Sequence, residues 1–288
     1  MAAGPNVEAA IAFIKANAKP ADLALLKVVH GESLDDDEVA ALTANQNPDG
    51  GFKVAELGPL SVVGRTAEMA IYLTALGGGD LGAVQAAADF LIEHQKPDGS
   101  WGESAALSAA NPPLHFKPDS IDSHGWETAA SVVALSGLGL PLDYKPPLEF
   151  LRNARLHLRG QRNLRLEGLL LFAVFRRFEG DDARTTVELR GEVEATRAAD
   201  LELFELNWAI YSLTLCGMDP RDPHMGAFGD ALTLKQRPEG GFGSGPQPNA
   251  YETGLSLGAL GLAGIIPHTR GHRAGGHEPD PANSDHGI

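Results

Sequence analysis

The chain has very little cysteine, few aromatic residues and a deficit of positive charge. Cys216 is the single cysteine among 288 residues, so an internal disulfide framework is excluded. Lysine and arginine number 23 against 38 aspartates and glutamates, which gives a formal net charge of −15. This charge argues against nucleic acid or an anionic membrane surface as the natural partner. The length is sufficient for a sizeable core.

Long hydrophobic runs are also missing. The apolar run GLLLFAVF (168–175) is far shorter than the ~20 residues needed to span a bilayer. The first residues, MAAGPNVEAAIAF, show no basic stretch followed by an apolar run, so we expect no signal peptide. No segment alternates apolar and polar residues as a half-buried strand requires. We therefore expect a soluble, cytoplasmic, helical protein without a transmembrane segment.

One short motif occurs three times. The sequences QNPDGGF, QKPDGSW and QRPEGGF begin at Gln46, Gln95 and Gln236. Gln46 and Gln95 are 49 residues apart, and Gln95 and Gln236 are 141 apart, which is three times 47. A fixed period of this size is typical of repeated supersecondary units that bury their faces only against one another. Two further units without the motif are expected between Gln95 and Gln236.

Each unit contains two segments of helical character. Nearly uncharged segments such as TAEMAIYLTALGG (66–78) and TGLSLGALGLAG (253–264) alternate with amphipathic, charged ones. Helices that are apolar on every side are buried on every side. We therefore predict twelve helices in six hairpins, closed into a single all-α domain, an α6/α6 toroid over residues 1–266. The Pro-acid-Gly turns would be its corners, with the glutamine amide satisfying backbone groups at a helix end.

The segment FLIEHQKPDGSW (90–101) resembles the QW repeat of squalene–hopene cyclases. Over about residues 5–266 the chain is similar to the toroids of terpenoid cyclases and protein prenyltransferases. The resemblance implies an apolar central cavity, open at one end of the inner helices, and a small apolar, isoprenoid substrate. It implies no cofactor, and the Asp, Cys and His zinc ligands of the prenyltransferases are absent, so no metal is expected.

One family motif is incomplete. Squalene–hopene cyclases protonate a double bond with an aspartate of Asp-x-Asp-Asp-Thr-Ala. The matching Thr-Ala pairs are Thr66-Ala67 and Thr128-Ala129, and Gly64 and Trp126 occupy the place of the acid. Acid/base chemistry of an isomerase, lyase or small-substrate cyclase therefore fits better than proton-initiated polycyclisation.

Acids recur where the inner helices are expected to start. Trp126-Glu127-Thr128 and Tyr251-Glu252-Thr253 share an aromatic-Glu-Thr pattern. Acids in a first turn are stabilised by the helix dipole, which gives each a purely structural explanation. In a ring, however, equivalent positions face one mouth, and crowded carboxylates raise one another's pKa. The acid/base candidates are Glu127, Glu252, Glu167 and Glu68, with His124 as a proton shuttle; the candidate substrate contacts are Trp126, Tyr251, Trp208, Asn207 and Arg65.

One connection is longer than the repeat allows. Gly77 and Gly137 are 60 residues apart, where the period predicts about 47. Long irregular connections often cover binding sites, so residues 102–123 are a candidate lid. Residues 267–288 are rich in Gly, Pro and His without an apolar period, and a disordered tail is expected there.

Two other functional classes remain open at this point. A carbohydrate-active α/α barrel would use paired carboxylates, although the inner segments offer few polar side chains to bind a sugar. A non-catalytic toroid that binds protein would need an exposed apolar patch. The sequence favours no particular oligomeric state.

Overall fold

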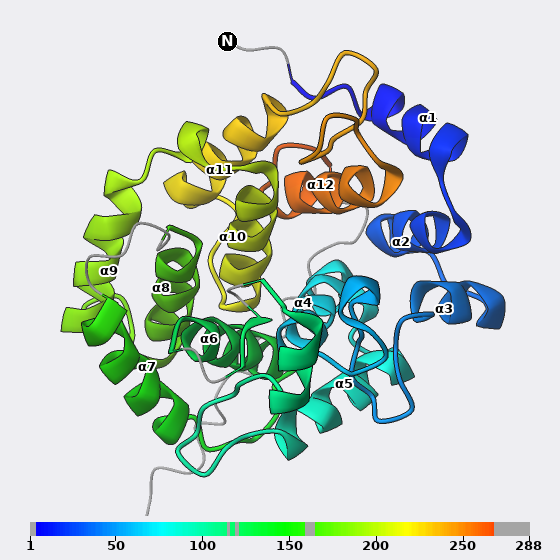
Figure 1. Ribbon diagram of the computed structural model, residues 1–288. Helices are drawn as coiled ribbons and strands as arrows, with labels where there is room; N and C mark the ends of the chain where they lie inside the picture. Colours follow the sequence, from blue (N-terminus) through cyan, green and yellow to red (C-terminus); the bar gives the residue numbers. More distant parts are fainter. Residues whose placement is uncertain (1–3, 114–115, 119–120, 159–164, 268–288) are drawn as a thin grey trace, which may run out of the picture.

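In the described part of the chain, twelve α-helices are paired into six hairpins and form a ring, with an inner set inside an outer set (Figure 1). The computed structural model describes residues 4–113, 116–118, 121–158 and 165–267. The inner helices are α2 (Pro20–His30), α4 (Val63–Leu73), α6 (Ile121–Gly137), α8 (Arg165–Glu179), α10 (Leu203–Leu215) and α12 (Ala250–Leu262). The outer helices are α1 (Val7–Asn17), α3 (Asp36–Leu42), α5 (Gly82–Glu93), α7 (Lys145–Leu158), α9 (Arg184–Ala195) and α11 (Pro223–Thr233). Within the described ranges extended pairing consists of three isolated bridges, and the predicted all-α toroid is confirmed.

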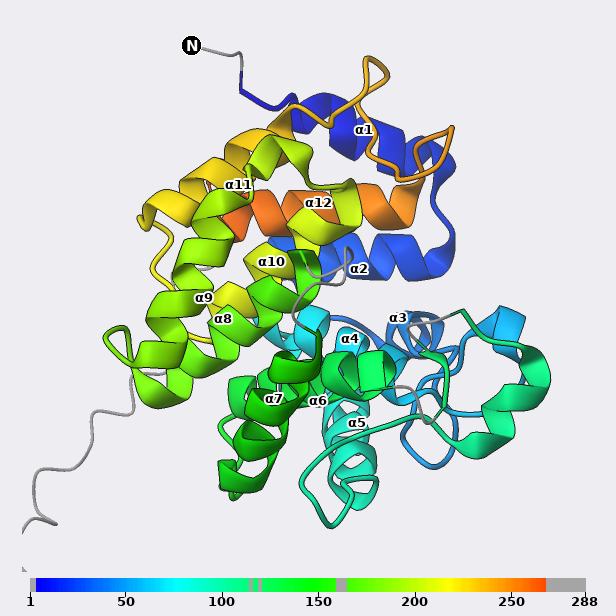
Figure 2. The same ribbon diagram turned by 60° about the vertical axis from the view of Figure 1, so that its left-hand side comes forward.

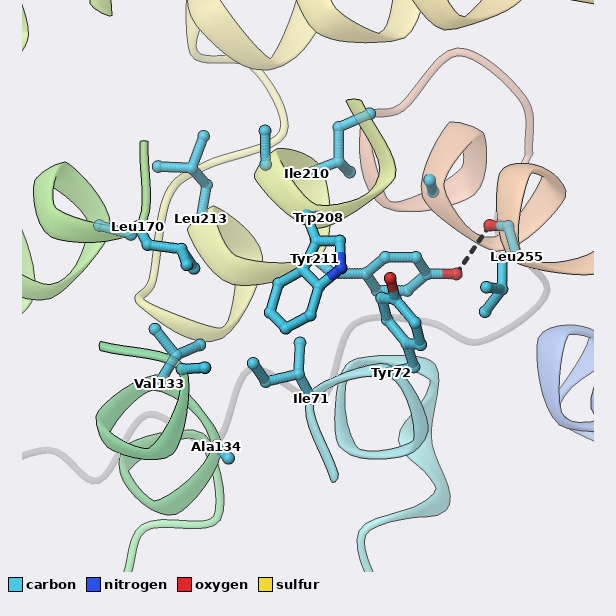
Figure 3. Close-up of a cluster of buried hydrophobic side chains, with 14 of the residues drawn as sticks. Ile71, Tyr72, Val133, Ala134, Leu170, Trp208, Ile210, Tyr211, Leu213 and Leu255 are labelled. Atoms are coloured by element: carbon cyan, nitrogen blue, oxygen red, sulfur yellow. Dashed lines mark hydrogen bonds between the residues drawn. The ribbon is translucent and has the colours of Figure 1, made fainter. Parts of the chain in front are cut away.

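The nearly uncharged segments form the inner ring because they are apolar on every side. Every residue of α8 from Leu169 to Phe175 is buried, and so is every residue of α6 from Glu127 to Leu135. Neighbouring inner helices pack in ring order, and η2 (Thr74–Gly78), which continues α4, contacts α2. Helix α10 also contacts α4 and α6, so side chains from opposite walls meet inside the ring (Figure 3).

The glutamine of each motif binds backbone groups at a corner. Its Nε2 group donates to the first glycine carbonyl of the same motif, from Gln46 to Gly50 (2.8 Å), Gln95 to Gly99 (3.2 Å) and Gln236 to Gly240 (2.8 Å). Gln46 also donates to the Ala83 carbonyl near the start of α5, at 2.7 Å. The amide thus satisfies carbonyls that the turn leaves unpaired, as the motif predicts.

The aromatic residue of each motif is tied to the inner helix that follows. The backbone N–H groups of Phe52, Trp101 and Phe242 donate to Oγ1 of Thr66, Thr128 and Thr253, at 2.8, 2.9 and 2.9 Å. All three threonines are fully buried. The recurring threonine is therefore the acceptor that fixes each corner to its helix.

The third motif closes the ring onto the first hairpin. The Asn6 N–H donates to Gln236 Oε1 at 2.8 Å, and Gln236 Nε2 donates to the Asn6 carbonyl at 2.9 Å. Gly240 has φ +91°, and a Cβ added there would lie 2.6 Å from the Ala9 backbone. Only glycine therefore fits where the last corner meets α1.

The segment before α6 packs against the side of the ring (Figure 2). Helix η3 (Ala105–Ala110) contacts η1 (Ala55–Leu57), and buried Leu107 joins Leu57 and Val62 in a small apolar cluster. Helix α6 begins at Ile121, so it includes the last residues of the candidate lid 102–123. Residues 114–115 and 119–120 of that segment, and 268–288 of the expected tail, lie outside the described residues. No helix in the described part has the length and apolar character required to cross a bilayer.

Candidate active site

Arg65, Glu68 and Tyr251 meet between the N-terminal parts of α4 and α12. Arg65 forms an ion pair with Glu68, and its Nη2 lies 3.4 Å from the Tyr251 hydroxyl. The guanidinium carbon lies 5.8 Å from the centroid of the Tyr251 ring, within the range of a cation–π contact. The Arg65 and Glu68 side chains are 24% and 21% exposed, so solvent reaches the pair. Three candidate residues from two helices are thus brought together.

The protonation states at this point follow from burial and charge. Burial acts to lower the pKa of Arg65, but Glu68 and Tyr251 more than offset this, and the pKa is raised above its ordinary value. Burial also raises the pKa of Tyr251, with the Arg65 charge acting in the opposite direction. At neutral pH Arg65 is therefore a guanidinium cation and Tyr251 a neutral phenol.

Four aromatic rings from α4, α6 and α10 form a continuous cluster. Trp126 and Trp208 meet edge to face with centroids 4.8 Å apart, and Tyr72 lies 5.7 Å from Trp208 and 4.8 Å from Tyr211. Burial raises the pKa of Tyr72 well above its ordinary value, and the nearby Glu68 adds to the effect. The cluster (Tyr72, Trp126, Trp208 and Tyr211) is therefore contiguous with the ion pair on α4.

Part of the toroid interior is occupied by these rings. Figure 3 shows Tyr211 reaching from α10 to α12, where its hydroxyl donates to the Leu255 carbonyl at 2.8 Å. A Cβ added at Gly258 would lie 2.5 Å from that hydroxyl oxygen and 2.5 Å from the Leu76 side chain. Side chains therefore meet where the family resemblance implies open space. Tyr72, Trp208 and Tyr211 are buried, whereas Trp126 is partly exposed, so Trp126 forms the accessible, outer end of the cluster. Arg65 and Glu68 are also partly exposed.

Glu127 lies in a second, buried site with a residue that sequence reasoning missed, Glu103. Both carboxyl groups are buried, and Glu127 hydrogen-bonds to Glu103. The two Glu103 oxygens accept the backbone N–H groups of Val63 and Gly64 at the start of α4, both at 2.9 Å. Burial raises the pKa of Glu103, while these backbone N–H groups and the hydrogen bond from Glu127 act against the rise. Two carboxyl groups in a hydrogen bond share at least one proton.

His124 lies one helical turn before Glu127, and the early start of α6 places both inside the helix. Its Nε2 is 3.2 Å from the Lys96 ammonium. An ammonium group only donates, so Nε2 is the acceptor and the ring proton is on Nδ1. Both groups lie against Gly102, where an added Cβ would come within 2.6 Å of them.

The remaining candidates are held at other points of the ring. The Glu252 carboxylate accepts the Ser244 N–H at 3.0 Å and is hydrogen-bonded by the side chain of Asn249, the residue that caps α12 by accepting the Glu252 N–H at 2.8 Å. Glu167 is buried in the first turn of α8. Asn207 is buried on α10 and donates to Ser256 Oγ at 3.3 Å. Its Oδ1 has no hydrogen-bond partner among the described residues, which leaves an acceptor for a polar group.

A signal for Glu103 exists in the repeat itself. Glu103 stands two residues after Trp101, and Ser244 stands two residues after Phe242. Ser244 binds Glu252, as Glu103 binds Glu127. The position two residues after the motif aromatic thus contacts the glutamate of the aromatic-Glu-Thr pattern in both units. In the described ranges no group of three or more His, Cys, Asp or Glu residues is suited to hold a metal ion.

The chain matches no protein-family model and no curated protein. Among solved structures, it is similar to a protein from Actinoplanes, with 16% identity and a TM-score of 0.51 over 90% of this chain and 98% of that one. The type II terpene cyclase MstE from Scytonema, in complex with its product merosterolic acid A, gives 14% identity and a TM-score of 0.48, over 90% of this chain and 96% of the other. Its complex with the substrate geranylgeranyl dihydroxybenzoate gives 15% and 0.48, over 90% and 97%. The likeness is one of fold.

Proposed function

We propose that the protein is an enzyme that acts on an apolar, isoprenoid substrate by acid/base chemistry at the outer end of the aromatic cluster. The observation that carries the proposal is that the aromatic cluster and the Arg65–Glu68 ion pair lie next to each other on α4, where Tyr72 follows Glu68 by one helical turn. The resemblance of residues 90–101 to the QW repeat agrees with this substrate class.

The aromatic rings suit a reaction that develops positive charge on carbon. The face of a Trp or Tyr ring attracts a cation by about 0.5–2 kcal/mol, and more as water is excluded. Trp126 is partly exposed and contacts buried Trp208, so apolar substrate atoms at the outer end would lie beside aromatic surface. A substrate that is stacked there would have its developing charge stabilised without a metal ligand set.

The proton transfers are assigned to two carboxyl groups. Glu68 is the proposed base, because its carboxylate is partly exposed and lies one helical turn before Tyr72 of the cluster. Glu127 is the proposed acid, because its hydrogen bond to Glu103 requires a proton in the pair. His124, held in one tautomer by Lys96, would return protons to Glu127 from solvent.

The occupied interior favours a small rearrangement over polycyclisation. Tyr72, Trp208 and Tyr211 take up space that a long folded polyprenyl chain would need. An isomerase, lyase or small-substrate cyclase needs only the outer end. The carbohydrate alternative is disfavoured, because the inner helices offer few polar side chains to bind a sugar.

The test is product analysis with linear prenyl alcohols and prenyl-substituted aromatic acids of increasing chain length. We expect a rearranged or cyclised product with wild-type protein, and turnover about 10²–10⁴-fold lower in Glu127→Gln and in Glu68→Gln, the usual contribution of acid–base catalysis. Glu205→Gln is the matched control, because Glu205 also lies in an inner first turn but caps the Glu202 N–H. No product from any prenyl substrate, or equal turnover in all variants, would contradict the proposal.

A further inference from the structure

The Glu103–Glu127 contact differs from its counterpart in the third repeat. There Ser244 donates its hydroxyl to Glu252 at 2.5 Å, an ordinary hydrogen bond to a carboxylate. In the second repeat a glutamate stands where the serine stands, and its partner is again a glutamate. Two carboxylates repel each other, so a hydrogen bond between the buried Glu103 and Glu127 carboxyl groups requires a proton on one of them.

The surroundings decide which carboxyl holds the proton. Both oxygens of Glu103 already accept backbone N–H groups, from Val63 and Gly64 at the start of α4. Two such bonds at a helix N-terminus favour a negative charge, through the N–H dipoles and the helix dipole. Glu103 is therefore the ionised partner, and Glu127 is the donor.

We infer that Glu103 is a positioning residue that keeps Glu127 protonated at neutral pH. The role of that proton in catalysis rests on the proposed function, but the protonation state does not. Among the described residues, His94 at the end of α5 acts to lower the pKa of Glu103, and Arg65, which follows Gly64 on α4, pairs with Glu68. Lys96 and His124 interact with each other beside Gly102. On the remaining side Phe116 lies against Gly64, where an added Cβ would come within 2.9 Å of its ring.

The direct test is infrared spectroscopy of the full-length protein, with and without ¹³C-glutamate, at neutral pH. A protonated carboxyl group absorbs apart from carboxylates, and the label assigns the band to glutamate. We expect the band in the wild type and in Glu205→Gln, and its loss in Glu127→Gln. The amide introduced by Glu127→Gln keeps an N–H donor for Glu103, so this variant should fold. Absence of the band in the wild type, or its persistence in Glu127→Gln, would overturn the inference.

Two variants of Glu103 test its positioning role. Glu103→Gln replaces the anion by an amide donor, and Glu103→Ser copies the third repeat. In both, Glu127 gains a donor and loses its anionic neighbour, so the protonated band should disappear although Glu127 is intact. If either folded variant retains the band, Glu103 does not control the proton.

The pH dependence supplies a readout that separates this inference from the proposed function. If turnover is found, the basic limb of its pH profile should shift to lower pH in Glu103→Gln, because Glu127 then ionises more easily. A wild-type band without turnover on any substrate would leave the inference intact and the proposed function wrong. Turnover that depends on Glu127, in a wild-type protein that lacks the band, would support the proposed function and overturn the inference.

Discussion

At the scale of single residues, Trp101 holds the second corner in place through burial and two hydrogen bonds. It is buried, its backbone N–H donates to Thr128, and its indole Nε1 donates to the Leu91 carbonyl at 2.6 Å. Trp101→Ala should lower the free energy of unfolding by about 3–5 kcal/mol, the usual cost of removing a large buried ring. Urea denaturation followed by circular dichroism measures the change.

The other two motifs provide the matched control for this prediction. Phe52 and Phe242 fill the same position without an indole N–H. Trp101→Phe should therefore keep most of the packing and cost less than Trp101→Ala: the Leu91 carbonyl loses the indole donor, worth about 0.5–1.5 kcal/mol, but keeps the His94 N–H at 3.2 Å. An alanine variant as stable as the wild type would refute the corner role of the motif.

The residue scale is also where sequence reasoning reached its limit. The aromatic-Glu-Thr pattern singled out Glu127 as a candidate, but its partner Glu103 depends on how residues 102–113 fold back onto α4. Tyr72 and Tyr211 were not predicted either, because both lie in apolar segments where a tyrosine is ordinarily part of the core. Tyr72 and Tyr211 are in contact because α10 packs against α4 across the ring, and sequence spacing does not encode that packing.

At the scale of elements, the period near 47 predicted the hairpins well. Inner helices were recognisable because burial on every side demands an almost uncharged sequence, as in Leu169–Phe175. Helix starts were less predictable. Helix α6 begins at Ile121, about one turn before the aromatic-Glu-Thr pattern indicates. The convergence of Arg65 with Tyr251, and of Trp126 with Trp208, follows from the ring closure that the repeat predicted.

The segment that precedes α6 makes an element-scale prediction. Leu107 is buried, whereas the side chains at 104–106 and 108–111 are exposed. If the segment covers the site, limited proteolysis should cut preferentially within 104–113, and a bound prenyl substrate should slow the cleavage because the cover is then held closed. Mass spectrometry of the fragments locates the cuts.

A matched region distinguishes a cover from an ordinary exposed loop. The loop at 244–247 is also exposed but joins the third motif to α12. Substrate should leave its cleavage rate unchanged. Equal protection of both loops, or none at 104–113, would make the segment a packed structural insertion.

At the scale of the whole molecule, each corner lies against the outer helix of the next hairpin, and the third corner reaches the first. An added Cβ would lie 2.2 Å from the Ala86 carbonyl oxygen at Gly50 and 2.6 Å from the Ala9 backbone at Gly240. The contacts of Gln236 with Asn6 therefore repeat, across the two ends of the toroid, the contact of Gln46 with Ala83. The two ends of the ring are therefore joined by the same kind of glutamine-to-backbone contact that joins neighbouring units within it.

This equivalence predicts the effect of opening the ring. Gly240→Ala should destabilise the protein by about 1–3 kcal/mol more than Gly180→Ala, because overpacking against α1 adds to the backbone strain that both share. Gly180 has a similar φ, +88°, and no heavy atom within 4 Å of an added Cβ, so it isolates the strain of about 1–2 kcal/mol. Amide hydrogen exchange should quicken in α1 and α12, which pack together, before it does in α7. Equal losses of stability in the two variants, or a uniform change of exchange, would show that the third corner does not hold the ring closed.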